Sequence, residues 1–316
     1  MIEKDFLLNI KTHLGVRELS TRIPNFRYYI NDKFFCMKVG VTSASGQLGS
    51  AIIDALKAMI GGDNLIAIAR TPENAAHHGV EVRKGNYKIK KDFDTALIGL
   101  DALLLVSGND NPENRKQQHA NVIDAAKDCG VKRVVYTSIQ GPTDSSDFSP
   151  IVNSNRHTEE YLKSSGLDWA IGRNGIYIEP DIEYLETYKK LGKIANCAVD
   201  GKCGYTTRAE LAYAYACLLI KPELGQQTYN LSGKAITQTE LTGYINKAFG
   251  TSLNYEELPV EDYTNERRAE LGDFLGTVIA GIYNGIRMGA FDNPSDYEKA
   301  AGRPHISWEE YFANLS

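Results

Sequence analysis

The sequence predicts an α/β fold: a doubly wound parallel sheet covered by helices on both faces, with a smaller mixed α/β lobe at its C-terminal end. Three observations predict it. From residue 37 to about residue 172, short apolar runs alternate with helical segments. The first apolar run leads through a turn rich in Gly and Ser directly into an amphipathic helix. Beyond residue 175 this alternation stops, and the segments that follow are too mixed for a second large domain.

The predicted strands are continuous apolar runs, which are typical of a parallel sheet buried on both faces. In chain order they read KVGVT, LIAIA, VEVRK, ALLLV, RVVYTS and DWAIG. The helices between and after them are predicted to begin near Gln47, Pro72, Lys91, Pro112 and Asn155. Right-handed crossovers between such units put ligands at the carboxyl ends of the strands, so the residues at those ends are the candidates for a site.

The first strand, turn and helix, residues 37–60, suit a phosphate group. A strand that runs through a tight turn into a helix points unpaired N–H groups and the positive end of the helix dipole at one spot. The dinucleotide fingerprint G-x-G-x-x-G is present in a looser form, with Ser43 at the usual first Gly, followed by Gly46 and Gly49. A packing turn that binds nothing is the alternative.

The second strand ends at Arg70, about twenty residues after the last glycine of the turn. An acidic residue at this place binds a ribose 2'-hydroxyl, whereas an Arg faces a 2'-phosphate. Arg70 therefore predicts NADP(H) rather than NAD(H). An exposed loop Arg without a ligand is the alternative.

Small or hydrogen-bonding residues also follow the later strands, where an extended cofactor would cross the sheet. In chain order they are Asn86, Ser107, Gly108, Thr137, Ser138, Asn174 and Tyr177. Turns favour these residue types, so an ordinary polar turn is the alternative for any single one of them.

Composition and charge exclude several classes of function. The 316 residues include 35 basic and 40 acidic side chains, a net charge of −5 without long runs of either sign, which argues against a nucleic-acid or membrane partner. No apolar stretch approaches the roughly eighteen residues that span a bilayer. The five cysteines form no C-x-x-C pair, which predicts reduced thiols in a cytoplasmic protein. No metal-ligand spacing is present, so no metal is expected.

Three regions are predicted. Residues 1–36 fall outside the pattern and are expected to be a poorly ordered extension; an arm that packs on the body or on a partner is the alternative. Residues 37–175 form the NADP-binding domain. Residues 176–316 form a smaller substrate lobe, partly interleaved with that domain, with helices over 180–191, 207–220, 237–249 and 261–288 and strands at QTYNLS and LNYEEL. The surface helix over 114–128 is the candidate contact for a homodimer.

Residues 37–316 resemble the NmrA-like, atypical branch of the short-chain dehydrogenase/reductases, and within it the reductases of quinones and of triphenylmethane dyes. The matching segments agree in order and spacing. They are SASGQLGSAIIDAL, LIAIARTPENA, LLLVSG, QHANVIDAAKDCGVKRVVYTS, HTEEYLKSSGLDWAIGRNGIY, DGKCGYTTRAELA and QTYNLSGKAITQTEL. The resemblance implies a Rossmann-type fold, NADPH as the cofactor, and two-electron reduction of a quinone or similar planar acceptor.

The resemblance also implies roles for single residues. The turn would wrap the pyrophosphate, Arg70 would hold the 2'-phosphate, and the later strand ends would lie along the nicotinamide half and the acceptor. The implied cofactor residues are Ser43, Ala44, Ser45, Gly46, Gln47, Leu48, Arg70, Asn86, Ser107, Gly108, Tyr136, Thr137 and Ser138. The implied catalytic residues are Asn155, Asn174 and Tyr177.

The chain departs from the family at three places. Ser43 replaces a Gly and would crowd the pyrophosphate or demand a shifted backbone, since Gly alone moves freely into positive φ. Asn86 stands where Asp is common, and Asn155 where the nearest relatives have His. The Tyr-x-x-x-Lys acid pair of the main branch is also absent, because Ile151 and Asn155 occupy its two positions.

Without that pair, chemistry that needs an internal acid is disfavoured. A quinone accepts hydride readily and can take its second proton from water, so the protein need only hold donor and acceptor face to face. His157 is the nearest titratable candidate and is expected to face solvent, while His119 is expected to be structural. A regulatory protein that binds dinucleotide without turnover is the main alternative; sugar-nucleotide or other ketone chemistry is a third.

Overall fold

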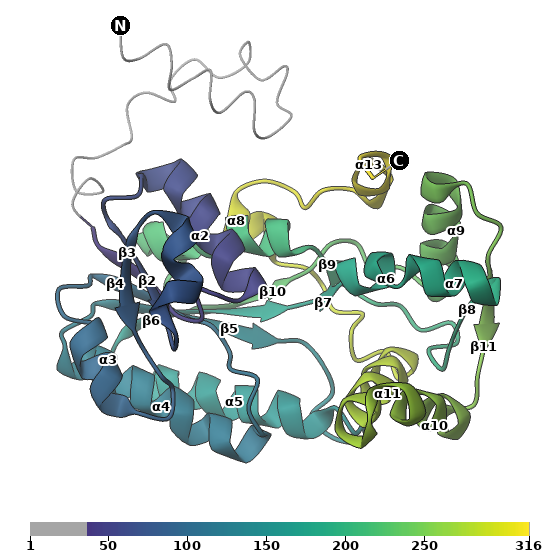
Figure 1. The fold of residues 1–316 in the computed structure, drawn as a ribbon, viewed down its shortest axis with the longest axis horizontal. Helices are drawn as coiled ribbons and strands as arrows, with labels where there is room; N and C mark the ends of the chain where they lie inside the picture. Colours follow the sequence, from purple (N-terminus) through teal and green to yellow (C-terminus); the bar gives the residue numbers. More distant parts are fainter. Residues whose placement is uncertain (1–36, 316) are drawn as a thin grey trace, which may run out of the picture.

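The computed structural model describes residues 37–315, and the extension predicted over residues 1–36 lies outside this part. Within it, seven parallel strands form one sheet in the order β3-β2-β1-β4-β5-β6-β10 (Figure 1). Their bounds are β1 Val39–Val41, β2 Leu65–Ala69, β3 Glu81–Lys84, β4 Ala102–Leu105, β5 Arg133–Ile139, β6 Asp168–Asn174 and β10 Gln227–Leu231. The predicted doubly wound parallel sheet is confirmed.

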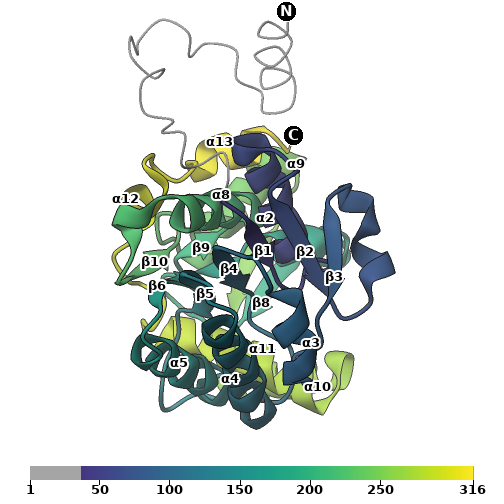
Figure 2. The same ribbon diagram turned by 90° about the vertical axis from the view of Figure 1, so that its left-hand side faces the viewer.

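Helices cover both faces of the sheet (Figure 2). The strands alternate their side chains between two apolar cores: Ala102 and Leu104 of β4 face one, and Leu103 and Leu105 the other. The first core lies under α2 Gln47–Ile60, α8 Arg208–Ile220 and α12 Tyr297–Ala301. The second lies under α3 Lys90–Ala96, α4 Pro112–Asp128 and α5 Ser149–Ser164. The 3₁₀ helix η2 Pro72–His78 links β2 to β3.

The strand order reverses between β1 and β4. From β1 the chain moves outward to β2 and β3 on one side, and then returns through α3 to β4 on the other. Helices on opposite faces of the sheet diverge at such a point and leave a crevice at the carboxyl ends of the strands, where nucleotides bind in folds of this kind.

The remaining elements form a lobe with its own apolar core, centred on Tyr205, Phe291 and Trp308. Two small parallel sheets support it, β7 Ile176–Tyr177 with β9 Tyr205–Thr206, and β8 Lys193–Asn196 with β11 Asn254–Glu257. The helical elements are α6 Glu179–Glu183, α7 Leu185–Leu191, η3 Pro222–Leu224, α9 Gln238–Phe249, α10 Val260–Leu271, α11 Asp273–Arg287 and α13 Trp308–Ala313. Two elements after residue 175 belong to the main sheet: β10 pairs with β6, and α8 covers one face. The division into two domains stays a prediction.

Some expected boundaries were wrong. Helix α5 begins at Ser149, six residues before Asn155, because Pro150 occupies the first turn, where its fixed φ favours a helix start. The helix expected over 180–191 breaks at Tyr184 into α6 and α7. The one expected over 261–288 breaks at Gly272, which has a φ of 83°.

Within residues 37–315, no helix is long and apolar enough to cross a bilayer. The same residues contain no group of three or more His, Cys, Asp and Glu side chains that could hold a metal ion. Helix α4 packs between α3 and α5, and its use as a dimer contact stays a prediction.

Candidate active site

The turn between β1 and α2 is shaped by two residues. Ser43 has a φ of 50°, in the left-handed region, and its carbonyl oxygen accepts the Gly46 N–H at 2.9 Å. A Cβ on Gly49 would lie 2.4 Å from that same oxygen, so only Gly lets α2 approach the turn this closely. The first turn of α2 has neither a capping side chain nor an acidic residue, and its positive end is therefore free for an anion.

The hydroxyl of Ser43 turns toward Tyr87, 3.1 Å away. Tyr87 also lies 2.7 Å from the hydroxyl of Thr42 and donates to the carbonyl oxygen of Val106 at 2.6 Å. Burial raises the pKa of Tyr87 to about 12, so the phenol keeps its proton. The turn is thus tied to the end of β4, and the extra side chain at position 43 has a partner within the protein.

The other predicted turn residues divide into two groups. Ser45, Gly46 and Gln47 are exposed at the start of α2. Ala44 and Leu48 are buried, and the N–H of Ala44 already donates to the carbonyl oxygen of Ile68 at 3.1 Å. Because the N–H of Gly46 is used within the turn, Ser45 and Gln47 are the exposed residues whose N–H groups remain for a ligand.

The residues predicted to select the cofactor follow β2 and β3. Arg70 is exposed, and its guanidinium has no hydrogen bond or ion pair within residues 37–315. Asn86 is partly buried, and its side-chain oxygen accepts the Lys88 N–H at 3.1 Å, which makes it a turn-forming residue. Arg70 therefore keeps its full capacity for a phosphate, whereas the oxygen of Asn86 is already in use.

Asn155 is 2% exposed and joins β4, β5, α4 and α5 beneath the crevice. Its amide oxygen accepts hydrogen bonds from the hydroxyl of Tyr136 at 2.5 Å, the hydroxyl of Ser107 at 2.8 Å and the guanidinium of Arg115 at 3.0 Å. The amide nitrogen donates to the carbonyl oxygen of Ile151 at 2.9 Å. The predicted site residues Ser107, Tyr136 and Asn155 are thus brought together.

Sequence reasoning missed Arg115, which is 4% exposed. No carboxylate of the described chain forms an ion pair with it, and its Nε atom has no partner there. Burial lowers the pKa of this guanidinium. The sequence around Arg115 is polar, so nothing in it marks this side chain as buried. Its contact with Asn155 is made only in the folded chain.

His119 and His157 lie where the sequence led us to expect them. The Nε2 atom of His119 is 3.1 Å from the Gly108 N–H and Nδ1 is 2.9 Å from the hydroxyl of Thr158. Burial and the nearby charge of Arg115 lower the pKa of His119 to about 3, so the imidazole is neutral and structural. His157 is exposed on α5.

Thr137 and Ser138 face into the protein. The hydroxyl oxygen of Thr137 accepts the Ser107 N–H at 2.8 Å, and the hydroxyl of Ser138 donates to Glu159 at 2.6 Å. Glu159 is fully buried between Arg156 and Arg173, at 2.7 and 2.6 Å. Both hydroxyls are therefore engaged beneath the crevice, where they fix the ends of β4 and β5.

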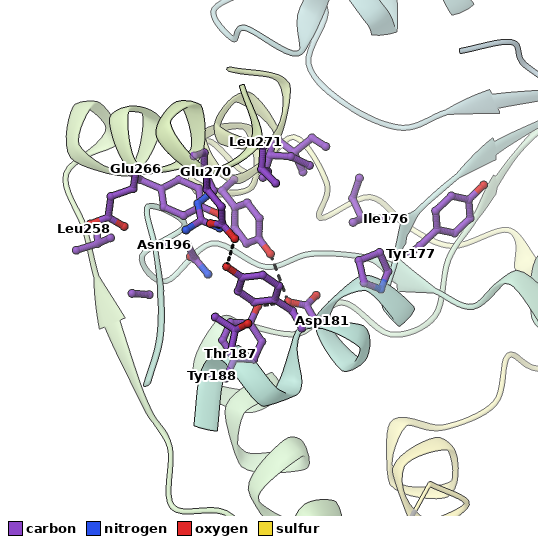
Figure 3. A pocket seen from close by; sticks show the side chains of 18 of the residues that line it. Ile176, Tyr177, Asp181, Thr187, Tyr188, Asn196, Leu258, Glu266, Glu270 and Leu271 are labelled. Atoms are coloured by element: carbon purple, nitrogen blue, oxygen red, sulfur yellow. Dashed lines mark hydrogen bonds and ion pairs between the residues drawn. The ribbon is translucent and has the colours of Figure 1, made fainter. Parts of the chain in front are cut away.

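Asn174, the last residue of β6, and Tyr177 of β7 line a cavity of about 1070 Å³. Figure 3 shows Tyr177 beside the other lining residues. The hydroxyl of Tyr215 donates to the side-chain oxygen of Asn174 at 2.6 Å, which leaves the amide nitrogen of Asn174 to point at the hydroxyl of Tyr177, 3.4 Å away. Asn155 does not line this cavity. The structure thus pairs two of the three predicted catalytic residues and places the third outside the cavity lining.

The cavity is bounded by tyrosines, together with aliphatic side chains. The aromatic lining residues are Phe148, Tyr177, Tyr184, Tyr188, Tyr263 and Tyr283. Asp181 lies among them on α6 and points toward Tyr188 on α7 (Figure 3). Asp181 was not among the site residues predicted from the sequence, although Asp181, Tyr184 and Tyr188 recur at the spacing of one helical face.

These residues fit a dinucleotide. The uncapped helix start, the close approach at Gly49 and the unpaired Arg70 suit phosphates, and a cavity large enough for an aromatic ring system opens at the end of β6. Fold and crevice define a Rossmann-type dinucleotide-binding protein. The chain belongs to the NAD(P)H-binding family, whose model matches residues 43–218, and to its NmrA-like branch.

Relatives of known activity support this assignment. Quinone oxidoreductase 2 of Escherichia coli is 32% identical over 285 residues, which cover 88% of this chain and 98% of that protein. Its structure with NADPH superposes with a TM-score of 0.81 over 88% of this chain and 99% of that one. Triphenylmethane reductase of Citrobacter sp. has the same TM-score and coverage at 30% identity. An NmrA-like oxidoreductase of Aspergillus flavus is 31% identical over 77% of this chain and 83% of its own.

Proposed function

We propose that the protein is an NADPH-dependent oxidoreductase that transfers hydride directly to a quinone or similar planar acceptor. The observation that carries the proposal is the tyrosine-lined cavity at the end of β6, in a sheet whose strand order suits a dinucleotide at the carboxyl ends of its strands. A volume of about 1070 Å³ admits an aromatic acceptor of two or three rings. The quinone oxidoreductase of E. coli supports the same class of reaction.

Arg70 supports the choice of NADPH over NADH. It is exposed at the end of β2, where the adenine ribose lies in folds of this class, and no carboxylate neutralises it within the described chain. A guanidinium suits a 2'-phosphate because its planar set of donors matches the phosphate oxygens.

The start of α2 would hold the pyrophosphate, because it has neither a capping side chain nor an acidic residue. The exposed backbone N–H groups of Ser45 and Gln47 would bind it, and Ser107 and Gly108 would border the nicotinamide half. When bound, the cofactor supplies the hydride. The protein holds the acceptor against it, with Asn174 and Tyr177 on the acceptor side.

Orientation carries most of the catalysis. The positions of the Tyr-x-x-x-Lys pair hold Ile151 and Asn155, and the phenol of Tyr136 is fully buried and bonded to Asn155. Asn155 therefore acts as a positioning residue that keeps Ser107 and Tyr136 in place. Holding two reactants face to face replaces a collision in solution by a step within one complex, which is a large rate effect.

NADPH oxidation tests the proposal across a panel of acceptors, with benzoquinone, a naphthoquinone and a triphenylmethane dye, beside calorimetry of NADPH binding. We expect cofactor binding and acceptor-dependent oxidation of NADPH. Tight NADPH binding without oxidation by any acceptor would instead support the dinucleotide-sensing regulator. Neither binding nor oxidation would refute both.

A further inference from the structure

We infer that Asp181, in its protonated form, donates a hydrogen bond and then a proton to an oxygen of the acceptor. The inference rests on the proposed function. It supplies a proton donor in place of the absent Tyr-x-x-x-Lys pair, whose positions hold Ile151 and Asn155. It assigns the cavity to acceptors that carry a carbonyl oxygen, because such an oxygen can receive the proton.

The geometry of Asp181 leaves one oxygen for a ligand. The side chain is 5% exposed and lines the cavity from α6. Its Oδ1 atom accepts the hydroxyl of Tyr188 at 2.9 Å and that of Tyr283 at 3.4 Å. The Oδ2 atom has no hydrogen-bond partner within residues 37–315. Hydroxyls from two helices, α7 and α11, thus hold the carboxyl group in place at the cavity wall and leave Oδ2 for an acceptor.

Among residues 37–315, no cation forms an ion pair with Asp181. The titratable groups that face it are phenols and one thiol, all with pKa values raised by burial and hence neutral. They are Tyr188 on α7, Tyr283 on α11, Tyr263 on α10, Tyr205 on β9 and Cys203 before β9.

The charged side chains of the cavity wall are used elsewhere. Lys193 pairs with Glu256 and Arg267 with Glu270, both at 2.8 Å, and Glu266 is exposed and carries the same sign of charge as Asp181. Burial therefore dominates at Asp181 and raises its pKa to about 6, although the hydrogen bonds from Tyr188 and Tyr283 oppose the rise.

An uncharged acceptor strengthens this effect when it binds. It displaces water from the cavity, and the ionised carboxylate loses the solvation that remained to it. The protonated form is then favoured and its O–H can donate to the carbonyl oxygen. Such an acid, with a pKa near the working pH, is suited to proton transfer.

The chemical step balances without any further reactant. The acceptor receives a hydride from the reduced nicotinamide, is reduced by two electrons and becomes an oxyanion, while the nicotinamide is oxidised. The O–H bond of Asp181 breaks, and its proton bonds to the oxyanion. The carboxylate that remains keeps the hydrogen bonds of Tyr188 and Tyr283, and water returns its proton in the next cycle.

The pH dependence of kcat/KM for a quinone tests the inference. For the wild type we expect a loss of about tenfold for each pH unit above the pKa of Asp181. The isosteric Asp181→Asn should be slower and flat over this range. Tyr188→Phe should move this fall in kcat/KM to higher pH. The lost hydroxyl no longer stabilises the carboxylate of Asp181, so the pKa of Asp181 rises. Glu183→Gln, an exposed acid on the same helix, should keep the wild-type profile.

Calorimetry of menadione binding gives a readout without turnover. Titrations at pH 7 in buffers of different ionisation enthalpy should show net proton uptake by the wild type and none by Asp181→Asn. Two results would overturn the role of Asp181 alone. One is turnover by Asp181→Asn with the same fall of kcat/KM at high pH, and the other is menadione binding by the wild type without proton uptake. Absence of both menadione binding and turnover would overturn the proposed function with it.

Discussion

The side-chain oxygen of Asn155 accepts a hydrogen bond from the hydroxyl of Tyr136 at 2.5 Å, so the partner of this fully buried phenol is an amide. In the main branch of the short-chain dehydrogenases, an ammonium occupies the helix position of Asn155. Here a cation from another helix, Arg115 of α4, donates to the same oxygen at 3.0 Å. A phenol and a cation are therefore brought together from different elements, but beneath the crevice instead of facing it.

Asn155→Leu should destabilise the fold by about 3 kcal/mol, because Tyr136, Ser107 and Arg115 lose their shared acceptor inside the protein. Urea denaturation measures the change. Asn153→Leu on the same helix is the control, and since Asn153 is exposed, we expect a loss of less than about 1 kcal/mol. Equal losses for both variants would show that the buried network adds no stability.

Arg70→Ala should raise the KM for NADPH by about tenfold to a hundredfold, the value of a charge-assisted hydrogen bond or two. The KM for NADH should change by less than about twofold, because NADH lacks the 2'-phosphate. Lys127→Ala removes an equal charge from the exposed end of α4 and should leave both constants unchanged. If NADPH and NADH are affected alike by Arg70→Ala, Arg70 does not select the cofactor.

Ser43→Gly should leave the stability nearly unchanged. The variant relieves a left-handed Ser, worth about 1–2 kcal/mol, but it loses the contact with Tyr87 and frees the unfolded chain, which together cost about as much. Because the hydroxyl is held against Tyr87, we also expect NADPH affinity within about threefold of the wild type. Calorimetry decides; a gain of tenfold or more would mean that Ser43 crowds the pyrophosphate.

Glu159→Gln should destabilise the protein by about 3 kcal/mol at neutral pH, since Arg156 and Arg173 lose their shared carboxylate. Burial alone would raise the pKa of Glu159, but its contacts with Arg173, Arg156 and Ser138 outweigh burial and hold it below the ordinary value. The stabilisation is therefore present above the unfolded pKa of about 4.3 and is lost as the pH falls through the folded pKa.

The difference in unfolding free energy between the wild type and Glu159→Gln should accordingly be constant from pH 6 to pH 8 and shrink below about pH 4. Glu160→Gln, the exposed neighbour, is the control and should show little difference at any pH. A difference that stays constant down to pH 3 would contradict the ion-pair account of Glu159.

The strands and the tight turn before α2 could be predicted from the sequence because their signals are local. Continuous apolar runs such as LIAIA and ALLLV are typical of buried parallel strands. The glycines at the start of α2 are required by the backbone geometry, because the helix approaches the turn closely. The start of α5 was missed because Pro150 was not recognised as a first-turn residue. Arg115 could not be assigned, since its partner Asn155 lies 40 residues away along the chain. Asp181 has a local partner in Tyr188 and was overlooked, whereas its second partner, Tyr283, lies 102 residues away.

The most direct test of the central claim is a single-turnover experiment. The wild-type protein, loaded with NADPH or with NADPH deuterated at the transferred position, is mixed with benzoquinone, and the loss of reduced nicotinamide is followed. The account predicts complete oxidation of the bound NADPH, one hydroquinone per NADPH, and slower oxidation of the deuterated form. NADPH that stays bound and reduced in the presence of the quinone would contradict it.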